Sequence, residues 1–222
     1  MAYPHAVVAS QLADADHDAL IIIGDNFSSL ADASLSHAIS AQQAVDARIS
    51  KQVTLLVIDS KRVILAPTGP LNRDYDDVRR YFDAAKLAVL EAKASGSTKP
   101  AILLASAHHD ARYKHALEVA FLGACQALWQ PLEAREFHGQ AIEPISQISL
   151  VGADEAMVKA LNAIAAGQYA ARDLCGTEPE RMAPPRFADY CVELFAGSKV
   201  SVDVISDIDT IDKDYPMMST VA

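Results

Sequence analysis

The sequence predicts an α/β fold in which helices pack on a central sheet. Two observations indicate this class. Short apolar stretches rich in β-branched residues, such as "HAVVA" (5–9) and "ALIIIG" (19–24), are typical of buried strands. Stretches with helical periodicity alternate with them along the chain, which is the order of elements in α/β domains.

The next segments continue this alternation. Residues 28–49 are rich in Ala and Ser and show a weak helical periodicity. Residues 53–59 and 62–67 are again apolar and β-branched, and we predict a pair of strands joined by Ser60 and Lys61.

A strongly amphipathic helix follows over 74–94, with a charged face opposite an apolar one. The predicted apolar face consists of Val78, Phe82, Ala85, Val89 and Ala92. A buried strand over 101–106, a helix over 112–129 and a last strand over 145–152 complete an N-terminal domain of residues 1–152.

The remaining residues predict a linker and the beginning of a second unit. Residues 153–175 form a predicted linker helix with an apolar stripe of Met157, Leu161, Ile164 and Ala165. Residues 176–222 start with a break, and then show a helix over 185–197 and a strand over 199–206. In that helix we expect Phe187, Tyr190, Cys191 and Leu194 to point inward. One helix and one strand cannot bury each other's apolar faces, so this α/β unit is predicted to be incomplete.

Composition limits the classes of function. Lys and Arg number 19 against 29 Asp and Glu, and the net charge of −10 argues against nucleic acid or an anionic membrane as a main partner. The three cysteines have no metal-binding spacing, and their odd number argues against a disulfide framework. The N-terminus has no signal-peptide pattern, and no apolar run approaches the ~20 residues of a membrane span. We therefore expect a cytoplasmic protein.

Three segments resemble the leucyl aminopeptidase family (cytosol aminopeptidases, peptidase family M17). The stretch "YAARDLCGTEPERMAPPRFADY" (169–190) resembles the family's junction between its two domains. The matching residues are Arg172, Asp173, Leu174, Pro179 and Pro184. Residues 117–136 resemble its small-residue helix with the Leu122-Gly123 pair, and residues 63–89 resemble its strand, Gly-containing turn and helix.

The resemblance implies a macro-domain-like N-terminal domain with a mixed sheet and flanking helices, a linker helix, and the start of a catalytic domain. It also implies that the full-length enzyme removes N-terminal residues from peptides with two divalent metal ions (Zn or Mn), and that it is a homohexamer. The family's metal-site motifs, such as Asn-Thr-Asp-Ala-Glu-Gly-Arg, do not occur in this sequence. We therefore expect a fragment, a short isoform or a truncated form that does not itself catalyse the reaction, and that is a monomer or a weak dimer paired through 150–205.

Three clusters of polar residues were considered as sites. His108, His109, Asp110 and His115 suggest a metal site, but adjacent histidines on one loop diverge, and Asp110 suits a helix cap. The acidic residues Asp207, Asp209, Asp212 and Asp214 lack the Gly and Glu of a calcium loop. The turn at Gly24, Asp25 and Asn26 follows a strand but has no glycine-rich phosphate loop. We therefore assign no catalytic, cofactor-binding or metal-binding residue.

Two other classes of function stay open. The first is a free-standing interaction or regulatory module that keeps the fold of the family without its peptidase activity. The second is a macro-domain-like nucleotide binder. The turn at residues 24–26 is the place where such a nucleotide would bind.

Overall fold

The computed structural model describes residues 3–28, 30–106 and 110–221 and contains two compact units, residues 1–173 and 174–222. Among the described residues, no helix is both long enough and apolar enough to cross a membrane.

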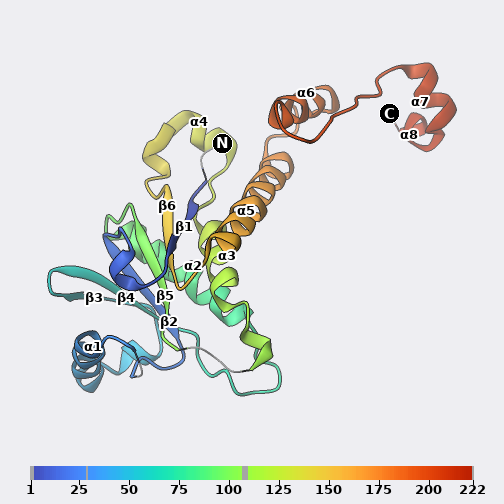
Figure 1. Cartoon of the computed structure of the whole chain (residues 1–222). Coiled ribbons are helices and arrows are strands. Elements are labelled where there is room, and N and C mark those ends of the chain that lie inside the picture. Colours follow the sequence, from blue (N-terminus) through green and yellow to red (C-terminus); the bar gives the residue numbers. More distant parts are fainter. Residues whose placement is uncertain (1–2, 29, 107–109, 222) are drawn as a thin grey trace. The chain divides into compact units, whose positions relative to one another are not determined.

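The first unit is built on a six-stranded sheet with the strand order β1-β6-β5-β2-β4-β3 (Figure 1). All neighbours are parallel except β3, which is antiparallel to β4. The strands are β1 (His5–Ala9), β2 (Ala19–Gly24), β3 (Thr54–Ile58), β4 (Lys61–Pro67), β5 (Pro100–Leu104) and β6 (Gln147–Val151). The predicted α/β class with a mixed sheet is confirmed. Strand β2 lies between β4 and β5 and is buried along its whole length, in agreement with its uninterrupted apolar sequence.

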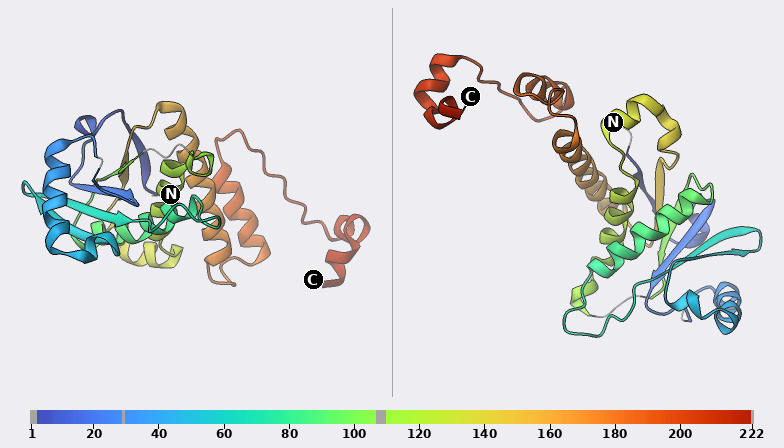
Figure 2. Two further views of the ribbon diagram at one scale, coloured as in Figure 1. Left: turned by 90° about the horizontal axis from the view of Figure 1, so that it is seen from below. Right: turned by 180° about the vertical axis from the view of Figure 1, so that it is seen from behind.

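Helices cover both faces of this sheet. The α-helices of the unit are α1 (Ala33–Val45), α2 (Arg79–Ala94), α3 (Ala116–Leu128), α4 (Leu132–His138) and α5 (Glu155–Gly176), and the short 3-10 helices are η1 (Leu12–Asp14), η2 (Ala47–Ser50), η3 (Ala111–Tyr113) and η4 (Gly139–Ile142). Helices α2, α3 and α5 lie on one face of the sheet, and α1 and η2 lie on the other (Figure 2). Buried side chains from these helices form a core on each face. The result is a three-layer arrangement with a core on each side of the sheet.

The β3–β4 hairpin turns at a different place from the predicted one. We expected Ser60 and Lys61 in the turn, whereas Asp59 and Ser60 form it with φ values of 51° and 61°. Positive φ at both central residues is the type I′ geometry that matches the twist of a two-residue hairpin, and Asp tolerates it. Lys61 instead pairs with Ile58 as the first pair of the ladder.

The buried face of α2 also differs in part from the predicted one. The helix begins at Arg79, so Val78 precedes it, and Phe82 is only partly buried. Tyr81, Ala84 and Ala88 join the core in addition to the expected alanines and Val89. The small side chains let α3 approach closely, and a Cβ atom at Gly123 would lie 2.5 Å from the backbone oxygen of Phe82. Gly123 thus allows this helix contact.

Helix α5 is anchored to the first unit by buried polar contacts. Asp173 has a fully buried side chain that accepts a hydrogen bond from Trp129 Nε1 at 3.1 Å and pairs with Arg135 of α4. Tyr169 donates to the backbone oxygen of Cys125 at 3.2 Å. The predicted apolar stripe is wrong at Ile164, which is 48% exposed. The buried positions recur every four residues, and they are Leu161, Ala165, Tyr169 and Asp173.

The second unit departs further from prediction. Helix α6 (Pro184–Phe195) begins with two prolines, which are favoured in the first turn of a helix. The strand predicted over 199–206 is absent, and residues 207–222, for which no element was predicted, contain α7 (Ile208–Asp214) and α8 (Pro216–Val221). A strand requires a neighbouring strand for its backbone hydrogen bonds, and the described part of this unit supplies none.

The side chains expected to face inward from α6 are likewise not buried. They are Phe187, Tyr190, Cys191 and Leu194, and Phe187 is 41% exposed. Among the described residues from 174 onward, Thr177 alone is buried. The unit therefore has no apolar core of its own within its described part.

Two glycines in helices should respond oppositely to replacement by alanine. Gly123→Ala should lower the free energy of unfolding by about 1–3 kcal/mol, because the new methyl group meets the backbone of α2, which cannot move aside. Gly167→Ala in α5 has open space around its Cβ and should raise stability by about 0.5–1 kcal/mol. Urea denaturation measures both, and a loss of stability in both variants would contradict the assignment of the close contact to Gly123.

A matched pair of aspartates tests the anchor of α5. Asp173→Asn keeps the shape but leaves Arg135 buried without its counter-charge, so we expect a loss of about 3–5 kcal/mol. Asp154→Asn is the control, because the exposed Asp154 accepts from Met157 N at the start of the same helix and Asn serves there equally well. Thermal and urea denaturation should separate the two variants, and equal stabilities would contradict the proposed anchor.

Candidate functional site

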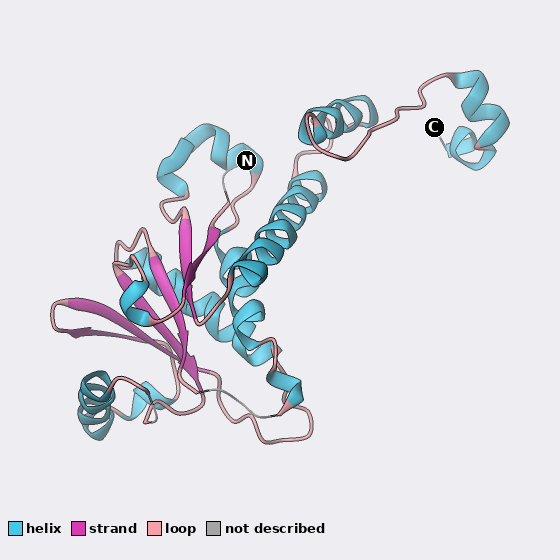
Figure 3. Ribbon diagram, in the orientation of Figure 1, coloured by secondary structure: helices cyan, strands magenta, loops and turns pink. Residues whose placement is uncertain are grey.

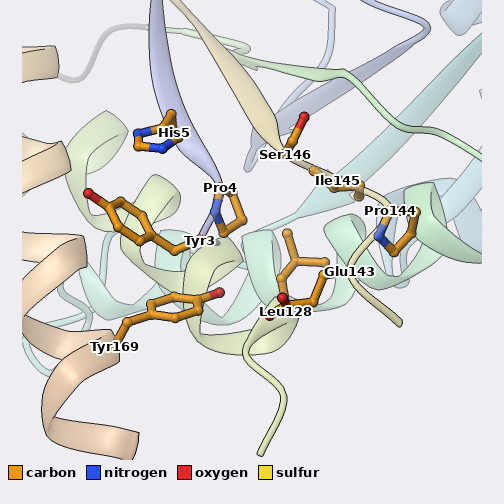
Figure 4. Close-up of a pocket in the computed structure, with 9 residues that line it drawn as sticks. All are labelled: Tyr3, Pro4, His5, Leu128, Glu143, Pro144, Ile145, Ser146 and Tyr169. Atoms are coloured by element: carbon orange, nitrogen blue, oxygen red, sulfur yellow. The ribbon is translucent and has the colours of Figure 1, made fainter. Parts of the chain in front are cut away.

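A pocket of about 450 Å³ lies where β1 and β6 begin (Figure 4). Its lining residues come from four places in the first unit: the approach to β1, the end of α3, the approach to β6, and α5. They are Tyr3, Pro4, His5, Leu128, Glu143, Pro144, Ile145, Ser146 and Tyr169. The two approaches are joined by a hydrogen bond from His5 N to Ser146 O at 3.0 Å.

Aromatic rings form one side of this pocket. The ring centroid of Tyr3 is 4.6 Å from that of His5 and 5.6 Å from that of Tyr169, and Figure 4 shows the three rings on the same side. Tyr169 is fully buried and burial raises the pKa of its hydroxyl, so this group is a neutral hydrogen-bond donor. The rings present a preformed apolar surface.

Glu143 provides the acidic group of the pocket. Its Oε1 atom is buried and has no hydrogen-bond partner among the residues that the structure describes. Burial raises the pKa of this carboxyl above its ordinary value, and the nearby Arg135 opposes the increase. The preceding backbone is fixed by Lys93, whose Nζ donates to the oxygen of Ile142 at 2.7 Å.

The pocket combines aromatic rings with a buried carboxyl group. The Cys125 thiol behind Tyr169 is buried, which raises its pKa to about 12 and keeps it unreactive. Among the described side chains, no three His, Cys, Asp or Glu residues are grouped so as to hold a metal ion. A ligand of this pocket would present apolar surface to the rings and a hydrogen-bond donor to Glu143.

The cluster around Asp110 has structural roles wherever it is described. Asp110 caps a helix, as expected, by accepting from Arg112 N at 2.9 Å, and it also pairs with the Arg112 side chain. The capped helix is the short η3 and not the long helix predicted over 112–129, because α3 begins only at Ala116. The ring of His115 contacts Glu118 at 2.9 Å. His108 and His109 lie outside the described residues.

The other two clusters are also explained by local structure. Asp207 caps α7 by accepting from Thr210 N at 2.9 Å, and Asp212 bonds to Ser219. At the end of β2, a Cβ atom on Gly24 would lie 2.7 Å from the Cβ of Ala105, which accounts for the glycine. Asn26 closes the turn by accepting from Ser28 N.

Sequence reasoning did not identify the pocket. Tyr3, Glu143 and Tyr169 are far apart in the chain, and Tyr3 and Glu143 belong to no motif. Tyr169 begins the junction segment, but the sequence assigned it no role. Asp173, in contrast, was named through the family resemblance, and the structure gives its physical role as the acceptor for Trp129 and Arg135.

The raised pKa of Glu143 predicts a pH-dependent effect of Glu143→Gln. Ionisation is harder in the folded state than in the unfolded state, so the folded protein loses stability as the pH rises through the folded-state pKa. The variant cannot ionise, so its stability relative to the parent should increase from pH 4 to pH 7. Urea midpoints at both pH values measure this, with Glu193→Gln on the exposed surface of α6 as the control. Parallel pH profiles of the parent and Glu143→Gln would contradict the prediction.

A protein with a similar sequence is known. No protein-family model matches the chain. The sequence is 33% identical over 229 residues to a protein of Caenorhabditis elegans named "Putative aminopeptidase", and the match covers 97% of this chain and 43% of that protein. The chain thus spans less than half the length of this relative.

Solved structures share the fold at lower sequence identity. A mutant tomato leucine aminopeptidase is similar with a TM-score of 0.66 and 16% identity, over 87% of this chain and 42% of that one. The bottromycin maturation enzyme BotP, solved in complex with Mn, has a TM-score of 0.58 and 20% identity, over 81% of this chain and 36% of that one. The sequence match to an aminopeptidase and the fold shared with a leucine aminopeptidase confirm the resemblance of this chain to the N-terminal region of the leucyl aminopeptidase family.

Proposed function

We propose that this chain is the N-terminal region of a metal-dependent aminopeptidase of the leucyl type, and that it does not itself cleave peptides. The observation that carries the proposal is the extent of the sequence match, which includes 97% of this chain but only 43% of the aminopeptidase relative. The match therefore involves both units of the chain, including the segment around Asp173.

In the proposed full-length enzyme, a pair of divalent ions, zinc or manganese, would supply an activated water for hydrolysis of the first peptide bond. The described residues do not fit such a pair of ions, because none of their acidic, His or Cys side chains form a group of three. The acidic side chains that looked suitable in the sequence, Asp110 and Asp207, cap helices instead. No catalytic step therefore falls to the described part of the chain.

The role that the structure supports is mechanical. The first unit has a core on both faces of its sheet, and α5 leaves it from a site fixed by Asp173 and Tyr169. These contacts fix the part of α5 that belongs to the first unit. We propose that the unit assists folding, assembly or access to the catalytic part, in a cytoplasmic enzyme that acts on peptides and forms hexamers.

The two other classes of function receive less support. A free-standing interaction module is compatible with the fold, but it does not account for the match to an aminopeptidase. A nucleotide-binding role would need a ligand site near Gly24, and the contact with Ala105 already explains that glycine.

A direct test is the hydrolysis of a leucyl chromogenic substrate in the presence of Mn²⁺ or Zn²⁺. The isolated chain should show no turnover above the buffer rate, because its described residues form no metal site. Turnover that a chelator abolishes would refute the non-catalytic role. The relation to an aminopeptidase is tested separately by reading the transcript beyond the codon for Ala222. A reading frame that continues into clustered acidic residues would support it, and an immediate stop codon would favour the interaction module.

A further inference from the structure

The pocket at the start of β1 and β6 is built from elements that are tied to one another. The two strands lie side by side at one margin of the sheet (Figure 3). Asn162 joins α5 to β1, because its Oδ1 accepts from Ala6 N at 2.8 Å and its Nδ2 donates to Ala6 O at 3.1 Å. Further along α5, Tyr169 donates to the backbone oxygen of Cys125 in α3. The pocket is therefore formed before a ligand binds, as is usual for small-molecule sites.

The carboxyl group of Glu143 is the polar feature of this pocket that still needs a partner. The side chain is half-buried, and its buried Oε1 atom has no hydrogen-bond partner in the described part of the chain. Burial raises the pKa of this carboxyl above its ordinary value. A carboxyl in this state is stabilised in its ionised form by a partner that donates hydrogen bonds and carries a positive charge.

The nearby positive side chains already have other partners. The residues that line the pocket include neither Lys nor Arg. The Nζ atom of Lys93 donates to the backbone oxygen of Ile142 at 2.7 Å, and Arg135 pairs with the buried Asp173. Neither of these cations donates to Glu143 in the structure, so a ligand that enters the pocket can supply the missing charge.

The aromatic side of the pocket also suits a positively charged ligand. The ring of Tyr3 is half-buried and is supported by the fully buried ring of Tyr169, at a centroid distance of 5.6 Å. His5 is exposed beside Tyr3, at 4.6 Å. The faces of aromatic rings attract cations, and the same faces pack well against apolar groups. Leu128 and Ile145 extend the apolar lining.

We propose that this pocket binds a small primary amine, whose ammonium group donates to the carboxyl of Glu143 and whose apolar body lies against the ring of Tyr3. A primary ammonium has the N–H donors that a quaternary one lacks, and an amino acid would bring a carboxylate for which the lining has no cation. The volume of about 450 Å³ is in the range of small-molecule sites.

This inference does not rest on the proposed relation to an aminopeptidase, because the pocket lies within the first unit and its test involves no hydrolysis. The test is calorimetric titration of the full chain with 2-phenylethylamine and with 2-phenylethanol, which has a neutral hydroxyl in place of the ammonium group. At pH 8 an ordinary histidine is neutral and a primary alkylamine is charged. We expect the amine to bind at least about tenfold more tightly than the alcohol. L-Phenylalanine, which adds a carboxylate to the same amine, should bind more weakly than 2-phenylethylamine.

Glu143→Gln separates recognition of the charge from general damage to the pocket. The variant should lose the preference for the amine and keep its affinity for the alcohol, whereas a damaged pocket would bind both ligands less well. Tyr3→Ala should weaken both ligands about two- to tenfold, because it removes a ring that both use. Glu193→Gln on the exposed surface of α6 is the control for the net charge of −10, which attracts any amine, and it should keep the full preference.

Circular dichroism confirms that each variant is folded. Four results would overturn the proposal: no binding of 2-phenylethylamine at millimolar concentration, equal affinities for the amine and the alcohol, a preference for the amine that persists in Glu143→Gln, or a preference that is also lost in Glu193→Gln. Binding of L-phenylalanine as tightly as the amine would refute the assignment to amines without a carboxylate.

Discussion

The attachment of α5 depends on one buried carboxylate. Asp173 lies in the last turns of the helix and is fully buried, and it joins Trp129 at the end of α3 to Arg135 in α4. A buried charge is tolerated only with such partners, so the three elements must be placed together. The segment between α3 and β6 contains α4 and provides Glu143 to the pocket. The ion pair between Arg135 and Asp173 holds this segment in place as well. Fold, pocket and linker therefore share one electrostatic constraint.

The parts of the fold that the sequence predicted correctly are those with a strong local pattern. The strands at β2 and β4 are uninterrupted apolar stretches, and the start of α6 is marked by two prolines. The predictions were wrong where contacts with neighbouring elements, and not the local sequence pattern, determine the structure. Residues 199–206 alternate like a strand, but the described part of the second unit contains no strand to pair with them. Ile164 lies on the exposed side of α5 because the buried positions follow a spacing of four.

The pocket was beyond sequence reasoning for a related reason. Tyr3 and Tyr169 are brought together only when the chain has crossed the whole sheet and returned along α5. The burial of Glu143, and the absence of a described hydrogen-bond partner for its Oε1 atom, are properties of the folded state alone. The family resemblance, in contrast, located Asp173 and Gly123 without giving their roles, and the structure supplies both roles.

The pairing of Asn162 with Ala6 has a consequence for growth of the sheet. A sheet with two open edges can add copies at both ends without limit, which leads to fibres. Here the side chain of Asn162 in α5 occupies the outward N–H and C=O groups of Ala6, so a strand of another molecule cannot pair with β1 at this residue. Replacement of Asn162 by an apolar residue would free both groups and open this position of the edge to pairing.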